Sequence, residues 1–177
     1  MKLAINPSPL DVNMWEKQWV DWLAAQGRFR GETAHWDWLG KLLRVGPDGN
    51  IVLLALVDDD DSLCHGLMMI KWPMASRLAP DGFAAHVEYL EIAPWNRAAI
   101  SPARVHKGIG TLLISYAVMC SVDWSLEGRV NLCSLPQAEG FYERIGMIAC
   151  GTGAGYDREL TFFELPAMSV EEFLNGV

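Results

Sequence analysis

The sequence predicts a mixed α/β fold in which a mixed sheet is flanked by helices. Two observations indicate this class. The first quarter of the chain places apolar residues at helical spacing, and the rest alternates between aliphatic runs typical of strands and further helical patterns. With 177 residues, of which 51% are hydrophobic and 20% charged, the chain has a globular composition and the length of one domain. We therefore expect a single domain over residues 1–177.

Two amphipathic helices are predicted near the N-terminus. The first covers Met14–Gly27 and ends at a glycine; the second follows Thr33, a suitable N-cap, and runs to Arg44. Aromatic side chains at helical spacing are most often core residues, and we interpret the tryptophans of these helices in that way. A cage for a cation, or a contact in a homodimer, is the alternative for an exposed aromatic face. The residues concerned are Trp15, Trp19, Trp22, Trp36 and Trp38.

Strand patterns dominate the middle of the chain. Aliphatic runs over Asn50–Val57 and Cys64–Trp72 flank an acidic turn and predict a hairpin. Ala84–Pro94 is a third strand, and Lys2–Asn6 is a short strand ahead of the helices.

Helices and strands then alternate towards the C-terminus. In chain order they are a helix from Gly110 to about Cys120, a strand over Arg129–Ser134, a helix over Gln137–Arg144, and strands near Met147–Cys150 and Glu159–Leu165.

Composition argues against two classes of partner. No apolar run reaches the roughly 18 to 20 residues that span a bilayer, and the N-terminus lacks the apolar stretch of a signal peptide, so we expect a cytoplasmic protein without membrane contact. A formal net charge of -8 argues against nucleic acid, because binding phosphates requires clustered Lys and Arg.

Neither the cysteines nor the acidic turn predicts a metal site. The four cysteines are far apart in the sequence, with no CxxC pair and no Cys/His cluster at ligand spacing. The run Asp58–Asp61 lacks the glycine and the distal glutamate of a calcium loop. We therefore expect no bound metal and reduced thiols.

The segment His106-Lys107-Gly108-Ile109-Gly110-Thr111 carries the strongest signal for a ligand. It precedes a predicted helix, so its backbone N–H groups form the positive end of that helix and suit a phosphate. It lacks the third glycine of a dinucleotide fingerprint, and the chain contains no Walker P-loop. A turn that needs glycine for conformational reasons is the other interpretation of this segment alone.

A second segment makes the pattern more specific. The strand Tyr89–Pro94 followed by Lys107–Gly110, together with the later run Ala138-Glu139-Gly140-Phe141-Tyr142-Glu143-Arg144-Ile145-Gly146-Met147, resembles the acetyl-CoA motif and the "AxxFYxxxGF" segment of the GCN5-related N-acetyltransferase (GNAT) superfamily. The resemblance covers nearly the whole chain. It implies a mostly antiparallel central sheet, acetyl-CoA as cofactor with CoA as product, and transfer of the acetyl group to a small-molecule, peptide or protein amine.

The resemblance also assigns residues to the cofactor. Main-chain groups of the strand segment pair with the pantetheine arm, and the amides of the turn take the pyrophosphate. The strand residues are Leu90, Glu91 and Ile92, and the turn residues are Lys107, Gly108, Ile109, Gly110 and Thr111.

The chemistry needs an acid and a base. The resemblance places Tyr142 near the thioester sulfur, where its phenol protonates the leaving thiolate. An amine must lose a proton before it attacks, and Glu88 and Glu91 are the candidate bases, on opposite faces of their strand because side chains alternate. The resemblance ranks Glu88 first, since the face that it shares with His86 carries the base in some family members. His86 is a third candidate, because its ordinary pKa lies near 6.5.

Two positions depart from the family pattern. Val105 stands where many members carry Arg or Gln, and Leu135 stands where many carry Asn. Arg97, Arg104 or His106 of the long loop Trp95–Lys107 would have to supply a missing phosphate contact. These departures leave a second interpretation open, in which the domain binds CoA or a protein partner without catalysis.

Overall fold

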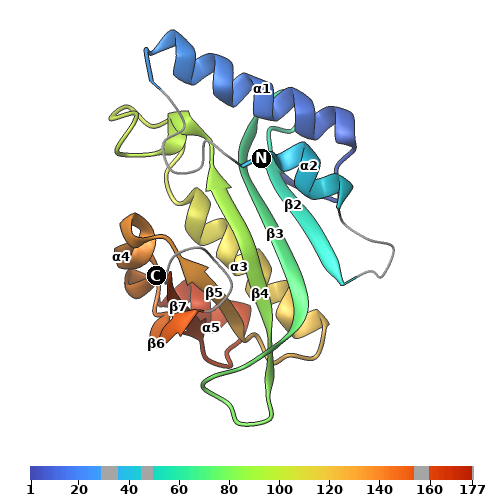
Figure 1. Cartoon of the computed structure of the whole chain (residues 1–177), viewed down its shortest axis with the longest axis vertical. Helices are drawn as coiled ribbons and strands as arrows, with labels where there is room; N and C mark the ends of the chain where they lie inside the picture. Colours follow the sequence, from blue (N-terminus) through green and yellow to red (C-terminus); the bar gives the residue numbers. More distant parts are fainter. Residues whose placement is uncertain (29–35, 45–49, 154–159, 177) are drawn as a thin grey trace. The chain divides into compact units, whose positions relative to one another are not determined.

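The computed structural model describes residues 1–28, 36–44, 50–153 and 160–176. Seven strands form one sheet in the order β1-β2-β3-β4-β5-β7-β6 (Figure 1). The pair β4–β5 is parallel, whereas β1–β2, β5–β7 and β6–β7 are antiparallel. The predicted class, a mostly antiparallel sheet flanked by helices, is confirmed. The strands are β1 (Lys2–Ile5), β2 (Ile51–Val57), β3 (Cys64–Ala75), β4 (Phe83–Ile92), β5 (Val130–Ser134), β6 (Ile148–Gly153) and β7 (Leu160–Leu165).

The described residues also form five α-helices and two short 3-10 turns, of which α5 follows the last strand and the others lie between strands. None of the helices there is long and apolar enough to cross a membrane. The helices are α1 (Pro9–Ala25), α2 (Trp38–Leu43), α3 (Ile109–Asp123), α4 (Glu139–Arg144) and α5 (Val170–Asn175), and the turns are η2 (Pro94–Asn96) and η3 (Pro136–Ala138).

By its internal contacts the chain divides into two compact units. The first comprises Met1–Met69 and Tyr89–Gly110, and the second Ile70–Glu88 and Thr111–Val177. Strands β3 and β4 and helix α3 each contribute residues to both units.

The core of the first unit is built from helix α1, helix α2 and the β2–β3 hairpin together with Ala93 and Trp95. The interpretation of the early tryptophans as core residues holds for Trp15, Trp19 and Trp38, which are fully buried, while Trp22 and Trp36 pack against them. Complete burial of such large side chains removes more apolar surface from water than any other residue type contributes.

Both early helices differ from the sequence prediction at their N-termini. Helix α1 begins at Pro9, where Ser8 and Asp11 form a capping box, so it is five residues longer at this end than predicted. Helix α2 has Asp37 as its N-cap, with the carboxylate accepting from the Gly40 N–H at 2.7 Å. The predicted cap Thr33 lies outside the described residues.

In the second unit, β5 and β6 pair with β7, and Glu164 of β7 fixes the end of β3. Its buried carboxylate accepts hydrogen bonds from the Ser76 hydroxyl and from the Arg77 N–H, the latter at 2.7 Å. The predicted helix over Gln137–Arg144 is present as α4 from Glu139, preceded by η3. Glu159, the predicted start of the last strand, lies outside the described residues, and α5 is an element that the sequence analysis did not identify.

Candidate functional site

The turn that was predicted to bind phosphate lies directly before helix α3. Gly108 adopts a left-handed backbone with φ of +78°, which glycine accepts without steric cost. Apart from the two chain neighbours, no atom of the described residues lies within 4 Å of the position that a Cβ would take at Gly108, and both Lys107 and Gly108 are exposed. The fifteen-residue helix α3 begins at the next residue. An exposed turn, an exposed lysine and the start of a helix are features of phosphate-binding sites in general.

Strand β4 enters this turn through η2 and a loop. Its parallel ladder with β5 joins Ala85–Val87 to Val130–Leu132, and Leu90 and Ile92 follow beyond these pairs. The carbonyl of Ile92 accepts a hydrogen bond from Arg97 Nε at 2.5 Å. One lone pair of a carbonyl expected to face pantetheine is therefore engaged by the chain itself.

Glu91 is a buried carboxylate with a fixed set of partners. It is 2% exposed, pairs with Arg97 Nη2 at 2.7 Å and accepts from the indole N–H of Trp38 at 2.6 Å. Burial of a charge is tolerated when it is paired and hydrogen-bonded in this way. The same contacts hold Arg97, which the sequence analysis considered for the phosphates, at Glu91 instead.

Glu88 lies in the second unit, in an ion pair with Lys71 Nζ. The same carboxylate oxygen is 3.6 Å from His86 Nε2. The face shared by His86 and Glu88, predicted from strand alternation, is thus real, and Lys71 joins it from β3.

The protonation of His86 follows from its other partner. Asn131 donates its amide to the Ala75 carbonyl at 3.3 Å, so its amide oxygen faces His86 Nδ1 at 2.7 Å and accepts the ring proton. Nε2 then carries the lone pair, on the side of Glu88. Burial lowers the pKa of His86 below its ordinary value of 6.5, which keeps the ring neutral at pH 7.

Tyr142 lies on helix α4 and is 7% exposed. Its ring packs against Phe163 of β7 at a centroid distance of 5.9 Å and against Phe141 at 5.1 Å. Burial raises the pKa of Tyr142 well above that of a free phenol, so the hydroxyl stays protonated at neutral pH.

Ser134 and Asn131 lie close in sequence to Leu135, where many family members carry Asn, and both side chains make internal hydrogen bonds. The Ser134 hydroxyl donates to the Leu135 carbonyl at 2.9 Å, and the Asn131 amide is used by His86 and Ala75.

An aromatic platform in the first unit holds a cation, and that cation belongs to the chain. Lys41 Nζ lies 4.0 Å from the ring centroid of Tyr89 and 5.6 Å from that of Trp36. Trp36, Trp38 and Tyr89 contact one another edge to face. Partial burial lowers the pKa of Lys41. The cation that contacts these aromatic rings is therefore Lys41 of the same chain.

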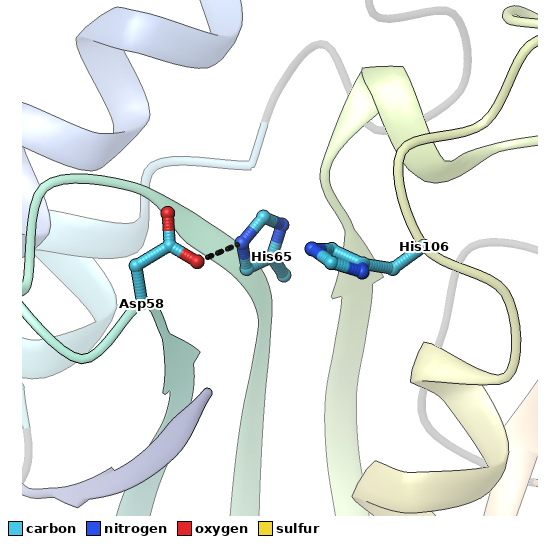
Figure 2. A group of neighbouring side chains, drawn as sticks. All are labelled: Asp58, His65 and His106. Carbon is cyan, nitrogen blue, oxygen red and sulfur yellow. Dashed lines mark hydrogen bonds and ion pairs between the residues drawn. The ribbon is translucent and has the colours of Figure 1, made fainter.

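The structure gathers a further group that sequence reasoning missed. Asp58, His65 and His106 each place one potential ligand atom within 4.8 Å of the others (Figure 2). Asp58 Oδ1 lies 2.9 Å from His65 Nε2, and the two imidazole rings meet at right angles with centroids 4.6 Å apart. His65 is 1% exposed. Their spacing along the chain, 7 and 41 residues, matches no metal motif, so no local signal could have found them.

Solved structures share this fold. An acetyltransferase of the GNAT family from Listeria monocytogenes has a TM-score of 0.55 and 14% identity over 92% of this chain and 94% of its own. The PaiA N-acetyltransferase of Thermoplasma acidophilum, in complex with coenzyme A, has a TM-score of 0.56 and 18% identity over 93% and 98%. A spermidine N-acetyltransferase chimera, SpeG from Vibrio cholerae and hSSAT, has a TM-score of 0.59 and 15% identity over 99% of both chains.

No protein-family model matches the sequence, and no curated protein matches it with a significant score. The likeness is therefore one of fold, and it extends over nearly the full length of each neighbour. The chain has the GNAT acetyltransferase fold, and the resemblance seen in its sequence motifs is confirmed at that level.

Removing one donor from Glu91 tests whether that buried carboxylate is ionised. Trp38→Phe should lower the free energy of unfolding by about 3 kcal/mol or more, because a buried charge loses a hydrogen bond. Trp19→Phe is the matched control, since the Trp19 indole donates to the neutral Cys64 carbonyl at 2.9 Å, and it should cost about 1–3 kcal/mol. Chemical denaturation measures both. Equal losses would mean that Glu91 is protonated.

The depressed pKa of His86 predicts an acid-sensitive stability. The unfolded chain takes up this proton at higher pH than the folded chain, so the contribution is complete above about pH 6.5 and falls as the pH drops towards the folded-state value. His86→Asn keeps a donor near the Nδ1 position and does not titrate. It should lose less stability than the wild-type protein between pH 7.5 and 5.5 in thermal melts. Parallel losses would refute the assignment.

Proposed function

We propose that this protein is an N-acyltransferase that transfers an acetyl group from acetyl-CoA directly to an amine. The observation that carries the proposal is the exposed turn at Lys107 and Gly108, directly before helix α3, in a fold shared with acetyltransferases. One neighbour of this fold was solved with coenzyme A. The whole chain acts as one domain, in the cytoplasm where acetyl-CoA is available.

Specificity for the cofactor rests mainly on backbone groups. The first N–H groups of α3, with the Lys107 charge and the Thr111 hydroxyl, bind the pyrophosphate. Main-chain groups of Leu90, Glu91 and Ile92 pair with the pantetheine arm as an added strand would. Bound acetyl-CoA supplies an activated thioester.

The attacking amine must be neutral, whereas free ammonium groups have pKa values near 10. We infer that the Glu88–His86 pair accepts the proton that the ammonium group loses. His86 Nε2 carries a lone pair, and a proton received there is stabilised by the Glu88 carboxylate 3.6 Å away. Glu91 is the weaker candidate, because Arg97 and Trp38 already occupy its carboxylate and stabilise its charged form.

Tyr142 assists departure of the thiolate. Complete proton transfer from a phenol of pKa 10 or more to a thiolate of pKa about 8.5 costs at least about 2 kcal/mol, and burial of Tyr142 raises this cost. The hydroxyl therefore stabilises the developing negative charge mainly as a hydrogen-bond donor.

A negative charge at the turn should abolish cofactor binding. Gly108→Glu puts a carboxylate into the open space at the turn, where it repels a phosphate. The left-handed backbone adds a strain of about 1–2 kcal/mol. Gly27→Glu is the matched control: Gly27 has φ of +63°, the same strain and likewise no described residue beyond its chain neighbours within 4 Å of a Cβ, but it lies after α1. Isothermal titration with CoA should show a loss of at least 100-fold for Gly108→Glu alone.

Tyr142→Phe removes the proposed donor and keeps the ring. Turnover, followed by thiol release with an amine acceptor, should fall by roughly 10-fold to 10,000-fold, while the affinity for CoA stays nearly intact. Tyr116→Phe makes the same change on α3 and should leave turnover within about threefold. Unchanged turnover in Tyr142→Phe would remove Tyr142 from the mechanism.

The second candidate is a domain that binds CoA or a protein partner without catalysis. It is favoured by Arg97, Asn131 and Ser134, whose polar groups are spent on internal contacts. Micromolar binding of CoA with no thiol release across small amines, amino-acid derivatives and peptides would support this reading. Absence of binding up to millimolar CoA would reject the cofactor site itself.

A further inference from the structure

The tautomer of His65 is fixed by its neighbours in the first unit. The Asn96 amide oxygen accepts from the His106 backbone N–H at 2.8 Å, so the Asn96 amide nitrogen is the atom that faces His65 Nδ1, at 3.1 Å. The Trp95 indole N–H also points to Nδ1, at 3.3 Å. Both groups are donors, so Nδ1 is an acceptor and Nε2 carries the proton, which it donates to Asp58.

This donor pattern decides between two roles for the group in Figure 2. Asp58, His65 and His106 are ligand types that bind zinc, and their atoms are close together. A neutral imidazole that binds a metal through Nε2, however, carries its proton on Nδ1 and donates it to an acceptor. In His65 such a proton would meet two donors, from Trp95 and Asn96. The arrangement therefore fits a hydrogen-bonded network of Asp58, His65, Trp95, Asn96 and the His106 backbone, which we call the junction. It does not fit a metal centre.

The junction closes the loop that leads to the cofactor turn. Asn96 ends η2 and holds the backbone of His106, and the Val105 N–H donates to the Trp95 carbonyl at 3.3 Å. The His106 ring packs on the ring of His65. Residues 97–104 thus form a loop with both ends fastened, and the chain leaves its second end straight into Lys107 and Gly108.

Because the junction is buried, each of its polar groups needs a hydrogen-bond partner within the protein. His65 is 1% exposed and Asn96 5%. A buried polar group without a partner costs far more than an exposed one, so the junction permits one arrangement of donors and acceptors. His65 itself is held from its backbone, since its carbonyl accepts from the Ala93 N–H at 3.0 Å.

We propose that His65 is a positioning residue for the cofactor turn: its Nδ1 orients the Asn96 amide, which fixes the His106 backbone and hence the approach to Lys107–Gly110. The proposal rests on the cofactor site proposed above only for its consequence in CoA affinity. The ordering of His106 by His65 stands independently of it. The proposal predicts that loss of the acceptor at His65 Nδ1 loosens the His106 backbone. Loss of the donor at Nε2, which faces Asp58, should loosen it much less.

Two substitutions separate the two sides of the ring. His65→Asn places its amide oxygen near the position of Nδ1, so it keeps an acceptor for Asn96 and Trp95 and gives up Asp58. His65→Gln places its amide nitrogen near Nε2, so it keeps the donor for Asp58 and gives up the acceptor. Both remove the ring and leave a similar void, and any general loss of stability is shared.

Amide hydrogen exchange read by NMR tests the proposal without a cofactor. Exchange at the His106 N–H should accelerate about 10-fold in His65→Gln and less than threefold in His65→Asn. Isothermal titration should show the same order for CoA, with Kd about 10-fold higher in His65→Gln. Equal effects of the two variants on His106 would overturn the proposal. Failure of the wild-type protein to bind CoA would reject the cofactor site and leave the exchange result to judge the junction.

Two further measurements test the role of Asn96 and the absence of a bound metal at the junction. Asn96→Ser shortens the side chain that links His65 to His106 and should accelerate His106 exchange about as much as His65→Gln, which also covers a His65 variant that fails to fold. Titration of the wild-type protein with Zn²⁺ should show no saturable binding at micromolar concentration. One-to-one Zn²⁺ binding that is lost in both His65 variants would show a metal centre and overturn the junction.

Discussion

The first unit of this protein is governed by the need to give every buried indole N–H an acceptor. Tryptophan brings a large apolar surface into the core together with one donor that must be satisfied there. Four such donors find partners on strands or loops distant in sequence: Trp15 bonds the Asp61 carbonyl, Trp19 the Cys64 carbonyl, Trp38 the Glu91 carboxylate and Trp95 the His65 imidazole.

Two of these acceptors are side chains that chemistry could otherwise use. Glu91 is committed to Trp38 and Arg97, and His65 is committed to Trp95, Asn96 and Asp58. A carboxylate stabilised by a cation and an indole is a weak base, and an imidazole with donors on one nitrogen is a poor metal ligand. Packing of the tryptophans thus commits two titratable groups of the first unit, Glu91 and His65, to internal hydrogen bonds.

The second unit presents a different arrangement. His86 donates to Asn131 and keeps a lone pair on Nε2, and Glu88 beside it is balanced by Lys71. A neutral histidine next to a carboxylate can receive a proton and have the resulting charge stabilised. The polar network of His86, Glu88 and Lys71 therefore lies in the second unit, and that of His65, Asn96 and Asp58 lies in the first.

The sequence by itself determined the order of the elements, the glycine turn before α3 and the shared face of His86 and Glu88, because helical periodicity, strand alternation and the conformational freedom of Gly108 are local properties. It also carried a local signal for α5 in the capping box of Ser169 and Glu172. Only the tertiary structure decided that Asp58, His65, Asn96 and His106 meet, and which nitrogen of His65 holds the proton. Those outcomes depend on contacts between residues up to 41 positions apart, whose partners no local pattern specifies.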